Sequence, residues 1–320
     1  MKDNLKPILK WAGGKRQMLP RLIKCIPKKF NNYIEPFIGG GALFFFLNKN
    51  NSIVSDTNDE LINLYKEVAK NPKKILKKLK EYKNTKEYFY TVRKKVPNNS
   101  TNRACRTIFL NRTCFNGLYR VNKKGKFNVP FADNKSIKLT DENNLLKVSK
   151  LLKKTKLLSL SYDLVLKKYA KKNDLVFLDP PYLPISKFSD FKRYTKEQFH
   201  LDDHKKLAIL YEELDSRGCH LILTNSNSPE ILKLYKKFNI KILNTKRNIL
   251  LITTDQMRFD ALGCNGGTIA TTQNIDSLAE RGINYLRAHN QNVACMPARA
   301  TMITGQHVGS HGVWMNGVSM

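Results

Sequence analysis

Long apolar runs, paired cysteines and acidic residues are all scarce in this sequence. No apolar stretch approaches the ~20 residues that a membrane-spanning helix requires. The first residues, Met1 to Lys6, lack the apolar core of a signal peptide. The six cysteines show none of the close spacings that mark metal sites or disulfide-rich scaffolds. These absences predict a cytoplasmic protein in a reducing compartment, without a membrane partner.

Charge is strongly unbalanced, because 26 acidic residues stand against 57 lysines and arginines, a formal net charge of +31. This excess is larger than solubility requires and predicts a polyanionic partner. It is confined to residues 1–247, since residues 248–320 contain no lysine and as many arginines as acids. Such a break in composition indicates a domain boundary, and the two parts are therefore interpreted separately.

In the basic part, the apolar run Leu175–Leu178 predicts a buried strand that stops at Asp179, Pro180, Pro181 and Tyr182. Two consecutive prolines supply no amide hydrogens, so the strand cannot continue. Ligands bind at the carboxyl ends of strands in open α/β sheets. A carboxylate, a free carbonyl and an aromatic ring gathered there would suit an amino group on an aromatic ring. The alternative is a strand followed by a proline-rich turn without function.

Two glycine segments precede this strand. Trp11–Lys15 carries paired glycines before a helical pattern, and Glu35–Gly41 carries a glycine triplet between a strand and a helix pattern. Such glycines permit close approach of the backbone to a ligand. Asp56 follows a second apolar strand, at the position where a pair of ribose hydroxyls would be held. Alternatively, Asp56 caps a helix expected over residues 59–68.

The remaining pattern of the basic part alternates helices and strands, which predicts an open α/β sheet. Residues 61–95 read as helical and basic. Toward the carboxyl end we expect helices over residues 202–214 and 229–237, and strands over 220–227 and 238–243.

Arginines, asparagines and aromatic residues interleave from Arg106 to Asn122, and Lys123–Lys126 has the composition of a hairpin tip. Arginine can bond guanine bidentately in the major groove, asparagine can bond adenine, and lysines contact phosphates. The pattern favours a DNA-reading segment. A basic surface loop without function is the alternative.

Taken in order, Trp11–Lys15, Glu35–Gly41, Asp56, Asn116–Arg120 and Asp179–Tyr182 resemble the motifs of Dam-type DNA adenine-N6 methyltransferases. The resemblance covers about residues 5–247. It implies a Rossmann-like sheet dependent on S-adenosylmethionine, with an inserted, mainly helical recognition domain and a flipped-out adenine of double-stranded DNA as acceptor. The implied catalytic domain comprises residues 1–60 and 147–247, and the target-recognition domain comprises residues 61–146.

By matching position, the resemblance assigns three sets of site residues. The donor site is lined by Trp11, Lys15, Phe37, Gly39, Asp56 and Asp179; the adenine is held by Asp179, Pro180, Pro181 and Tyr182; and DNA is contacted by Asn116, Leu118, Arg120, Lys123 and Lys124. Arg120 matches a guanine-reading arginine, which implies the target GATC. The pair Tyr162-Asp163 lies near a further family motif but matches it poorly and receives no role. The family also implies a monomer, with a restriction endonuclease as a functional partner but without a stable complex.

Residues 248–320 are similar to the amino-terminal part of sulfatases and phosphonate monoester hydrolases. The similarity lies in Cys-x-Pro-x-Arg at Cys295–Arg299, followed by Thr-Gly. It implies that Asp255 corresponds to a metal ligand, Cys295 to a formylglycine precursor and Arg299 to its support. The later metal ligands of that family are absent from the segment, so we expect a truncated α/β fragment without a metal site. A helix is expected over residues 274–281. Residues 249–253 have the composition of a strand that would pair with residues 238–243.

Four other functions remain open from the sequence: a cytosine-N4 methyltransferase, a non-catalytic DNA-binding module, an inert fusion product and a sulfatase-type hydrolase. The methyltransferase interpretation makes a geometric prediction. Because methyl transfer requires near contact, an Asp179 more than roughly 15 Å from both Trp11 and Gly39 would exclude this interpretation.

Overall fold

The computed structural model describes residues 5–11, 13–122, 124–132, 137–183, 199–243, 259–268, 270–281, 294–304, 307–316 and 318. The chain forms two compact units, residues 1–243 and residues 244–320. Among the described helices, none is long and apolar enough to cross a membrane.

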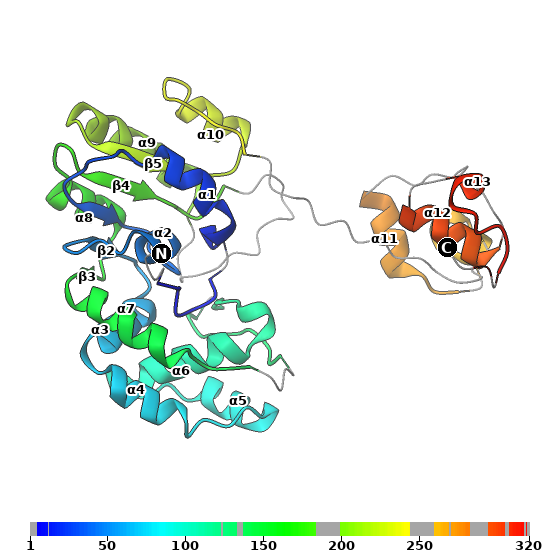
Figure 1. The fold of residues 1–320 in the computed structure, drawn as a ribbon, viewed down its shortest axis with the longest axis horizontal. Helices are drawn as coiled ribbons and strands as arrows, with labels where there is room; N and C mark the ends of the chain where they lie inside the picture. The colour runs from blue at the N-terminus through cyan, green and yellow to red at the C-terminus, as the bar shows by residue number, and fades with distance from the viewer. Residues whose placement is uncertain are drawn as a thin grey trace. The chain divides into compact units, whose positions relative to one another are not determined.

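A parallel sheet forms the centre of the first unit (Figure 1). Its described strands lie in the order β3-β2-β1-β4-β5 and all neighbours run parallel. The strands are β1 (Tyr33–Glu35), β2 (Ile53–Ser55), β3 (Lys156–Leu158), β4 (Leu175–Leu178) and β5 (His220–Leu223). The order reverses between β1 and β4, so the switch point of the sheet lies between these two strands. The predicted α/β class with a doubly wound parallel sheet is confirmed.

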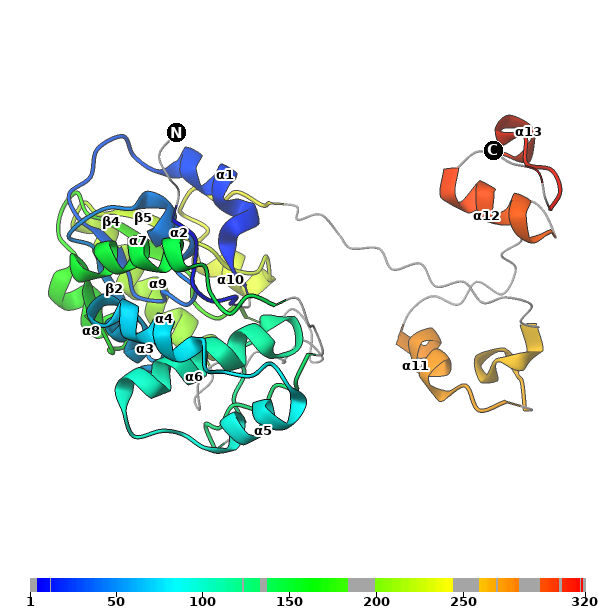
Figure 2. The ribbon, with the colours of Figure 1, turned by 60° about the horizontal axis from the view of Figure 1, so that its bottom comes forward.

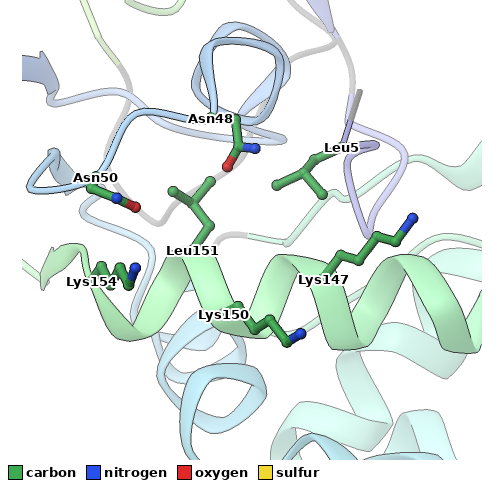
Figure 3. A pocket seen from close by; sticks show the side chains of 7 residues that line it. All are labelled: Leu5, Asn48, Asn50, Lys147, Lys150, Leu151 and Lys154. Carbon is green, nitrogen blue, oxygen red and sulfur yellow. The ribbon is translucent and has the colours of Figure 1, made fainter. Parts of the chain in front are cut away.

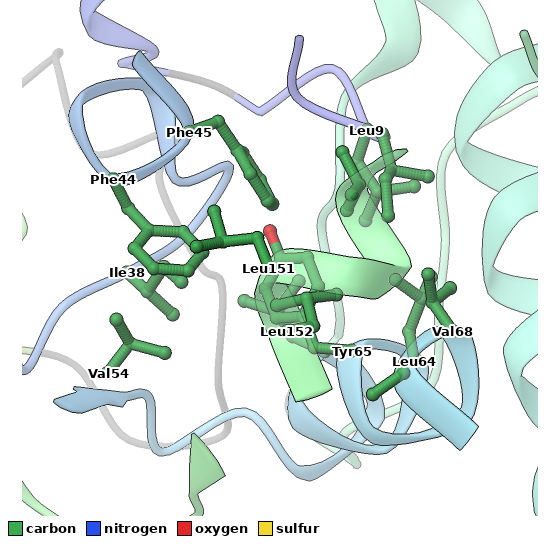
Figure 4. Packing of buried hydrophobic residues seen from close by; sticks show 14 of the residues in the cluster. Leu9, Ile38, Phe44, Phe45, Val54, Leu64, Tyr65, Val68, Leu151 and Leu152 are labelled. Carbon is green, nitrogen blue, oxygen red and sulfur yellow. The ribbon is translucent and has the colours of Figure 1, made fainter. Parts of the chain in front are cut away.

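Helices cover both faces of the sheet, because successive side chains of a strand point to opposite faces. Tyr33, Leu175 and Phe177 pack on one face with α2 (Ala42–Leu47), α3 (Asp59–Lys70) and α7 (Glu142–Lys153). Figure 4 shows part of this core, where aromatic rings of α2 and leucines of α7 meet side chains of α3. The alternate residues Ile34 and Val176 pack on the opposite face with α8 (Tyr162–Tyr169) and α9 (Leu201–Ser216).

A helical part extends the first core beside the sheet. It contains α4 (Pro72–Leu79), α5 (Lys86–Lys94) and α6 (Ser100–Thr113), which lie together in both views (Figures 1 and 2). The helices α3, α4 and α5 confirm the helical pattern expected over residues 61–95. The Arg106 guanidinium of α6 donates hydrogen bonds to the Val92 and Arg93 carbonyls of α5, which ties these two helices together.

A second apolar cluster joins α5 and α6 to the chain that follows them: Phe89, Phe109, Leu110, Cys114, Tyr119, Val121, Phe127 and Val129. After the short helix η3 (Phe115–Gly117), Val121 pairs with Phe127 in an antiparallel bridge. Gly125 has a φ of +73° between them, a conformation that glycine adopts without strain. The predicted hairpin tip is therefore present, although Lys123 lies outside the described residues.

The remaining described elements are short. At the amino end, η1 (Lys15–Met18), α1 (Leu19–Leu22) and η2 (Ile23–Cys25) follow one another, and α10 (Pro229–Leu234) follows β5. The second unit contains η4 (Phe259–Ala261), η5 (Gly263–Asn265), α11 (Gln273–Arg281), α12 (Cys295–Thr304) and α13 (Val308–His311). The helix expected over residues 274–281 is confirmed by α11.

The strand predicted over residues 238–243 is wrong. Residues 239–243 form no regular element, and Ile242 keeps 62% of its side-chain surface exposed. An alternating apolar pattern makes a strand only where a neighbouring strand pairs with it, and β5 pairs with β4 alone among the described residues. The strand expected to cap this edge, residues 249–253, lies outside the described residues. The predictions for residues 220–227 and 229–237 were too long, since β5 ends at Leu223 and α10 at Leu234.

Candidate active site

Asp179 stands directly after β4, next to the switch point of the sheet. Its side chain is 20% exposed, so the carboxylate is open to a ligand without being fully solvated. Pro180 is buried, while Pro181 and Tyr182 are half-buried. The structure therefore gathers a carboxylate, a proline carbonyl and a tyrosine ring at the carboxyl end of a central strand.

Two side chains from distant segments hold the carboxylate of Asp179. Lys15 Nζ lies 2.7 Å from Oδ2, and Thr224 Oγ1 donates a hydrogen bond of 2.6 Å to Oδ1. Lys15 Nζ also donates to the Gly13 carbonyl and lies 4.8 Å from the ring centroid of Tyr182. Burial opposes the charge on Lys15, but Asp179 and Tyr182 outweigh that effect and raise the pKa of this lysine above its ordinary value.

The two glycine segments meet around Trp11. A Cβ on Gly39 would lie 2.9 Å from Trp11 Cδ1, and Gly39 has a φ of +44°, so only glycine fits this position. Because Trp11 touches Gly39 and Lys15 touches Asp179, the structure brings the two glycine segments and the proline turn together, as the geometric prediction required. Trp11 also stacks on Tyr119, with 4.9 Å between ring centroids.

Asp56 follows β2 and faces the glycine turn. Its Oδ2 accepts the Gly39 N–H and its Oδ1 accepts the Asn58 N–H, each at 3.0 Å. Burial raises the pKa of Asp56 to about 6, although these amide hydrogen bonds act in the opposite direction. The capping alternative for Asp56 is wrong, because the cap of α3 is Asn58, whose side chain accepts the Leu61 N–H.

Glu35 is a buried acid that sequence reasoning did not single out. Tyr33 donates a hydrogen bond of 2.8 Å to its Oε2, and only 2% of Glu35 is exposed. Burial raises the pKa of Glu35 well above its ordinary value. Glu35 is thus enclosed in the core, whereas Asp179 beside Lys15 is partly open to solvent.

Two aromatic rings pack against Phe37, which precedes the glycine turn. Phe37 stacks on Tyr162 with 5.2 Å between centroids, and Phe199 meets Phe37 edge-on at 5.8 Å. Tyr162 received no role from the sequence. It begins α8 after β3, and its signal in the sequence was a poor match, together with Asp163, to a further family motif.

The far end of the proline turn is held from the chain that follows β5. The Leu183 N–H donates to Asn225 Oδ1 at 3.4 Å, and Asn225 Nδ2 lies 3.3 Å from His204 Nδ1. Burial lowers the pKa of His204 to about 4, so this fully buried ring is neutral at pH 7. Sequence reasoning also missed Thr224, Asn225 and His204. Small polar residues after a strand, and a histidine within the amphipathic helix α9, give no sign of what they contact.

The segment predicted to read DNA, Arg106 to Asn122, is divided: residues 106–113 belong to α6 and are mostly buried, and residues 114–122 lead into the hairpin. Arg120 Nε donates to Asn128 Oδ1 at 3.0 Å, across the two strands of the hairpin. Asn116 and Lys124 are exposed, and Leu118 is half-buried. Asn116 has a left-handed φ of +54°, and Phe115 beside it is 54% exposed. Exposed polar and aromatic side chains therefore line this segment.

Asn111 of α6 joins this segment to the amino-terminal glycine segment. Its Oδ1 accepts the Lys10 N–H at 3.0 Å, and its Nδ2 donates to the carbonyls of Lys10 and Gly117 at 2.8 and 2.9 Å. Asn111 is fully buried. A Cβ on Gly117 would lie 2.5 Å from Lys10 Cδ, which shows how closely the two segments pack.

In the second unit, Cys295 is exposed at the start of α12 and Arg299 is exposed within it, while Asp255 lies outside the described residues. Among the residues that the structure describes, no group of three or more metal-ligating side chains comes together.

A pocket of about 280 Å³ lies at the amino-terminal ends of the strands, where the chain enters β2 and β3 (Figure 3). Its lining consists of Leu5, Asn48, Asn50, Lys147, Lys150, Leu151 and Lys154. Because the strands are parallel, the pocket lies at their amino-terminal ends, opposite to the carboxyl ends where Asp179 stands. The pocket is therefore separate from the site described above.

Comparison with known proteins divides the chain in the same two parts. Residues 11–249 match the family described as D12 class N6 adenine-specific DNA methyltransferase, and residues 247–319 match the sulfatase family. Both resemblances inferred from the motifs are confirmed.

Three curated relatives match most of the chain. The type II methyltransferase M.MjaIII of Methanocaldococcus jannaschii is 42% identical, and the match covers 77% of this chain and 93% of the relative. The type II methyltransferase M1.LlaDCHI of Lactococcus lactis subsp. cremoris is 40% identical over 77% of this chain and 90% of the relative. A DNA adenine methylase of Haemophilus influenzae is 32% identical over 78% of this chain and 90% of the relative.

Proposed function

The chain belongs to the D12 class of N6 adenine-specific DNA methyltransferases, and from this premise we propose how its site works. We propose that it transfers a methyl group from S-adenosylmethionine to N6 of an adenine extruded from double-stranded DNA, within the sequence GATC. The observation that carries this proposal is the meeting of Asp179, at the carboxyl end of β4, with Lys15 from the glycine segment. This contact joins the acceptor side of the site to its donor side.

The residues on the donor side fit S-adenosylmethionine, which supplies an electrophilic methyl group. The glycine turn leaves no room for a side chain at Gly39, as a backbone cradle for a ligand requires. Asp56 offers carboxylate oxygens to a ribose hydroxyl pair, and the Phe37–Tyr162 stack offers an apolar face to an adenine ring. Lys15 supplies a positive charge for the carboxylate of the donor's methionine part.

On the acceptor side, the lone pair of an amino group bonded to an aromatic ring is drawn into that ring. Asp179 and the Pro180 carbonyl accept hydrogen bonds from the amine and so increase electron density on N6. Tyr182 stacks on the base, which offsets part of the few kcal/mol that extrusion costs. N6 would bond to the methyl carbon as the carbon–sulfur bond of the donor breaks, which leaves a neutral thioether as the leaving group. The Asp179 carboxylate would stabilise the positive charge that grows on nitrogen. The N6 proton then leaves to solvent.

Sequence choice is assigned to the hairpin. Within the described residues, Arg120 bonds Asn128 through Nε, and we assign its two Nη groups to a bidentate pair with guanine. Asn116, Leu118, Lys123 and Lys124 would contact the duplex around it. The DNA contacts are assigned to residues 114–131, which share an apolar cluster with α5 and α6. We keep residues 61–146 as the proposed target-recognition domain, with 1–60 and 147–247 as the catalytic domain.

The test is a methylation assay of the full chain on duplexes that carry a single GATC, with analysis of the nucleoside products. N6-methyladenine is the expected product, whereas N4-methylcytosine would support the alternative methyltransferase. Asp179→Ala should abolish transfer and leave DNA retention within about 2-fold of the unchanged protein, because the carboxylate acts on charge that develops only during transfer. Asp202→Ala, which removes an exposed acid paired with Lys205, is the control and should remain active. Parallel loss of transfer and of DNA retention in Asp179→Ala would indicate a structural role instead.

A further inference from the structure

We propose that Thr224 is a positioning residue, which holds the Asp179 carboxylate in the single orientation that the incoming amine requires. This inference rests on the proposed function of the Asp179 site. Thr224 does not contact the substrate in this scheme, and it acts only through the carboxylate.

The backbone of Thr224 is hydrogen-bonded to the sheet, which fixes the position of its hydroxyl. The Thr224 N–H donates to the Leu178 carbonyl at 2.9 Å, directly after the register pair Leu178–Leu223 of β4 and β5. Thr224 is 7% exposed, and its Oγ1 lies 2.6 Å from Asp179 Oδ1. Because Thr224 is β-branched and backbone-bonded, its hydroxyl has little freedom to move.

The sequence of the turn explains why such a donor is needed. A carboxylate at a strand end is commonly held by the backbone N–H groups that follow it, but Pro180 and Pro181 have none. Lys15 also contacts the carboxylate, at Oδ2, through a longer side chain with more rotatable bonds. Thr224 is a short, rigid donor at Oδ1, and we assign to it the orientation of the carboxylate plane.

The next residue holds the other end of the same turn. Asn225 Oδ1 accepts the Leu183 N–H, and Asn225 is in turn held by the buried His204 ring. Two consecutive residues at the end of β5 thus hold the turn from Asp179 to Leu183 at both ends. This arrangement places the acceptor groups on a rigid support, as transfer between closely positioned atoms requires.

The first measurement compares Thr224→Val with Thr224→Ser in the full chain, by single-turnover methyl transfer and by steady-state kinetics. Valine keeps the shape and removes the hydroxyl, so kcat should fall about 10- to 100-fold while both KM values stay within about 2-fold. Serine restores the hydroxyl and should recover kcat to within about 3-fold. Unchanged kcat in Thr224→Val, a loss confined to KM, or an equal loss in both variants would overturn the inference.

The matched control is Thr101→Val. Thr101 is also buried and also donates to a carboxylate, Glu67 Oε2 at 2.7 Å, in the packing of α6 on α3. This variant removes the same kind of hydrogen bond, so its melting temperature should fall by an amount similar to that of Thr224→Val while kcat is retained. An equal loss of kcat in the control would attribute the effect of Thr224→Val to stability alone.

A second measurement decides the inference without any turnover. In a crystal structure of Thr224→Val, the Asp179 carboxylate should be rotated or divided between orientations. A carboxylate that keeps its single orientation would overturn the positioning role. Lack of adenine methylation by the unchanged protein would instead count against the proposed function, and the orientation of Asp179 would still decide the role of Thr224.

Discussion

Asn111 offers a test of the link between the donor-side segment and the DNA-reading segment, and this test needs no assumption about catalysis. The Asn111 side chain makes three hydrogen bonds inside the core: it accepts from the Lys10 N–H and donates to the carbonyls of Lys10 and Gly117. Asn111→Leu replaces it with a side chain of similar volume that can make none of these bonds. The N–H and the carbonyl of Lys10, in half-buried bonds, and the Gly117 carbonyl, in a buried bond, would then lose this partner.

The expected size of the effect follows from these three groups. Each buried polar group left without a partner costs about 1–3 kcal/mol, and the added apolar surface of leucine offsets about 1–2 kcal/mol. Three such groups cost about 3–9 kcal/mol together, so the net loss in the free energy of unfolding should be about 1–8 kcal/mol. The half-buried bonds to Lys10 place it in the lower half of that range. That is a large part of the 5–15 kcal/mol that ~100- to 200-residue domains commonly have.

The measurement is urea unfolding of the full chain, followed by far-ultraviolet circular dichroism. The matched control is Asn63→Leu, because the Asn63 side chain donates an exposed hydrogen bond to the Ser100 carbonyl and makes no other that the described part of the chain shows. The control should change the free energy of unfolding by less than about 1 kcal/mol. An Asn111→Leu effect no larger than that of the control would refute the reasoning, since the three bonds would then contribute little to the fold.

Two further predictions concern DNA reading and donor binding. Arg120→Ala should lower discrimination at the guanine position by about 10- to 100-fold, and Asn128→Ala should act in the same direction but less, because it only releases the guanidinium. Comparison of kcat/KM on GATC and on singly substituted duplexes measures this, and a uniform fall on all duplexes would contradict the assignment. Burial raises the pKa of Asp56 to about 6, so the carboxylate needed for ribose hydroxyls is lost as the pH falls through that value. In calorimetry, binding of S-adenosylmethionine should weaken between pH 7 and pH 5, and Asp56→Asn should bind it weakly at every pH. A pH-independent affinity in the unchanged protein would show that Asp56 does not bind the donor in its ionised form.

The raised pKa of Asp56 also makes the free energy of unfolding depend on pH. The folded state of Asp56 binds its proton more tightly than the unfolded state, whose pKa is about 3.8. Its contribution to stability is therefore fully present below about pH 4 and is lost as the pH rises through about 6. Donor binding and this stability contribution thus change in opposite directions across the same pH window, which separates the two effects experimentally.

Local features of this protein were readable from its sequence. The run Leu175–Leu178 ends at Asp179 in the structure as predicted, because burial of an apolar run and the missing amide hydrogens of two prolines are properties of the segment itself. The glycine turn after β1 and the hairpin tip at Gly125 followed for the same reason, since their backbone conformations suit glycine alone. Five motifs in order also sufficed to identify the family.

Contacts between distant segments were decided only by the tertiary structure. Asp179 contacts Lys15 and Thr224, and Phe37 contacts Tyr162. These residues meet because the strand order β3-β2-β1-β4-β5 brings the carboxyl ends of the parallel strands together. The strand expected over residues 238–243 failed on the same ground: its pattern was suitable, but strand formation requires a paired neighbour. Sequence determined which groups this protein carries at its turns, and packing of the sheet determined which of them meet, because a hydrogen-bond partner many residues away leaves no local trace.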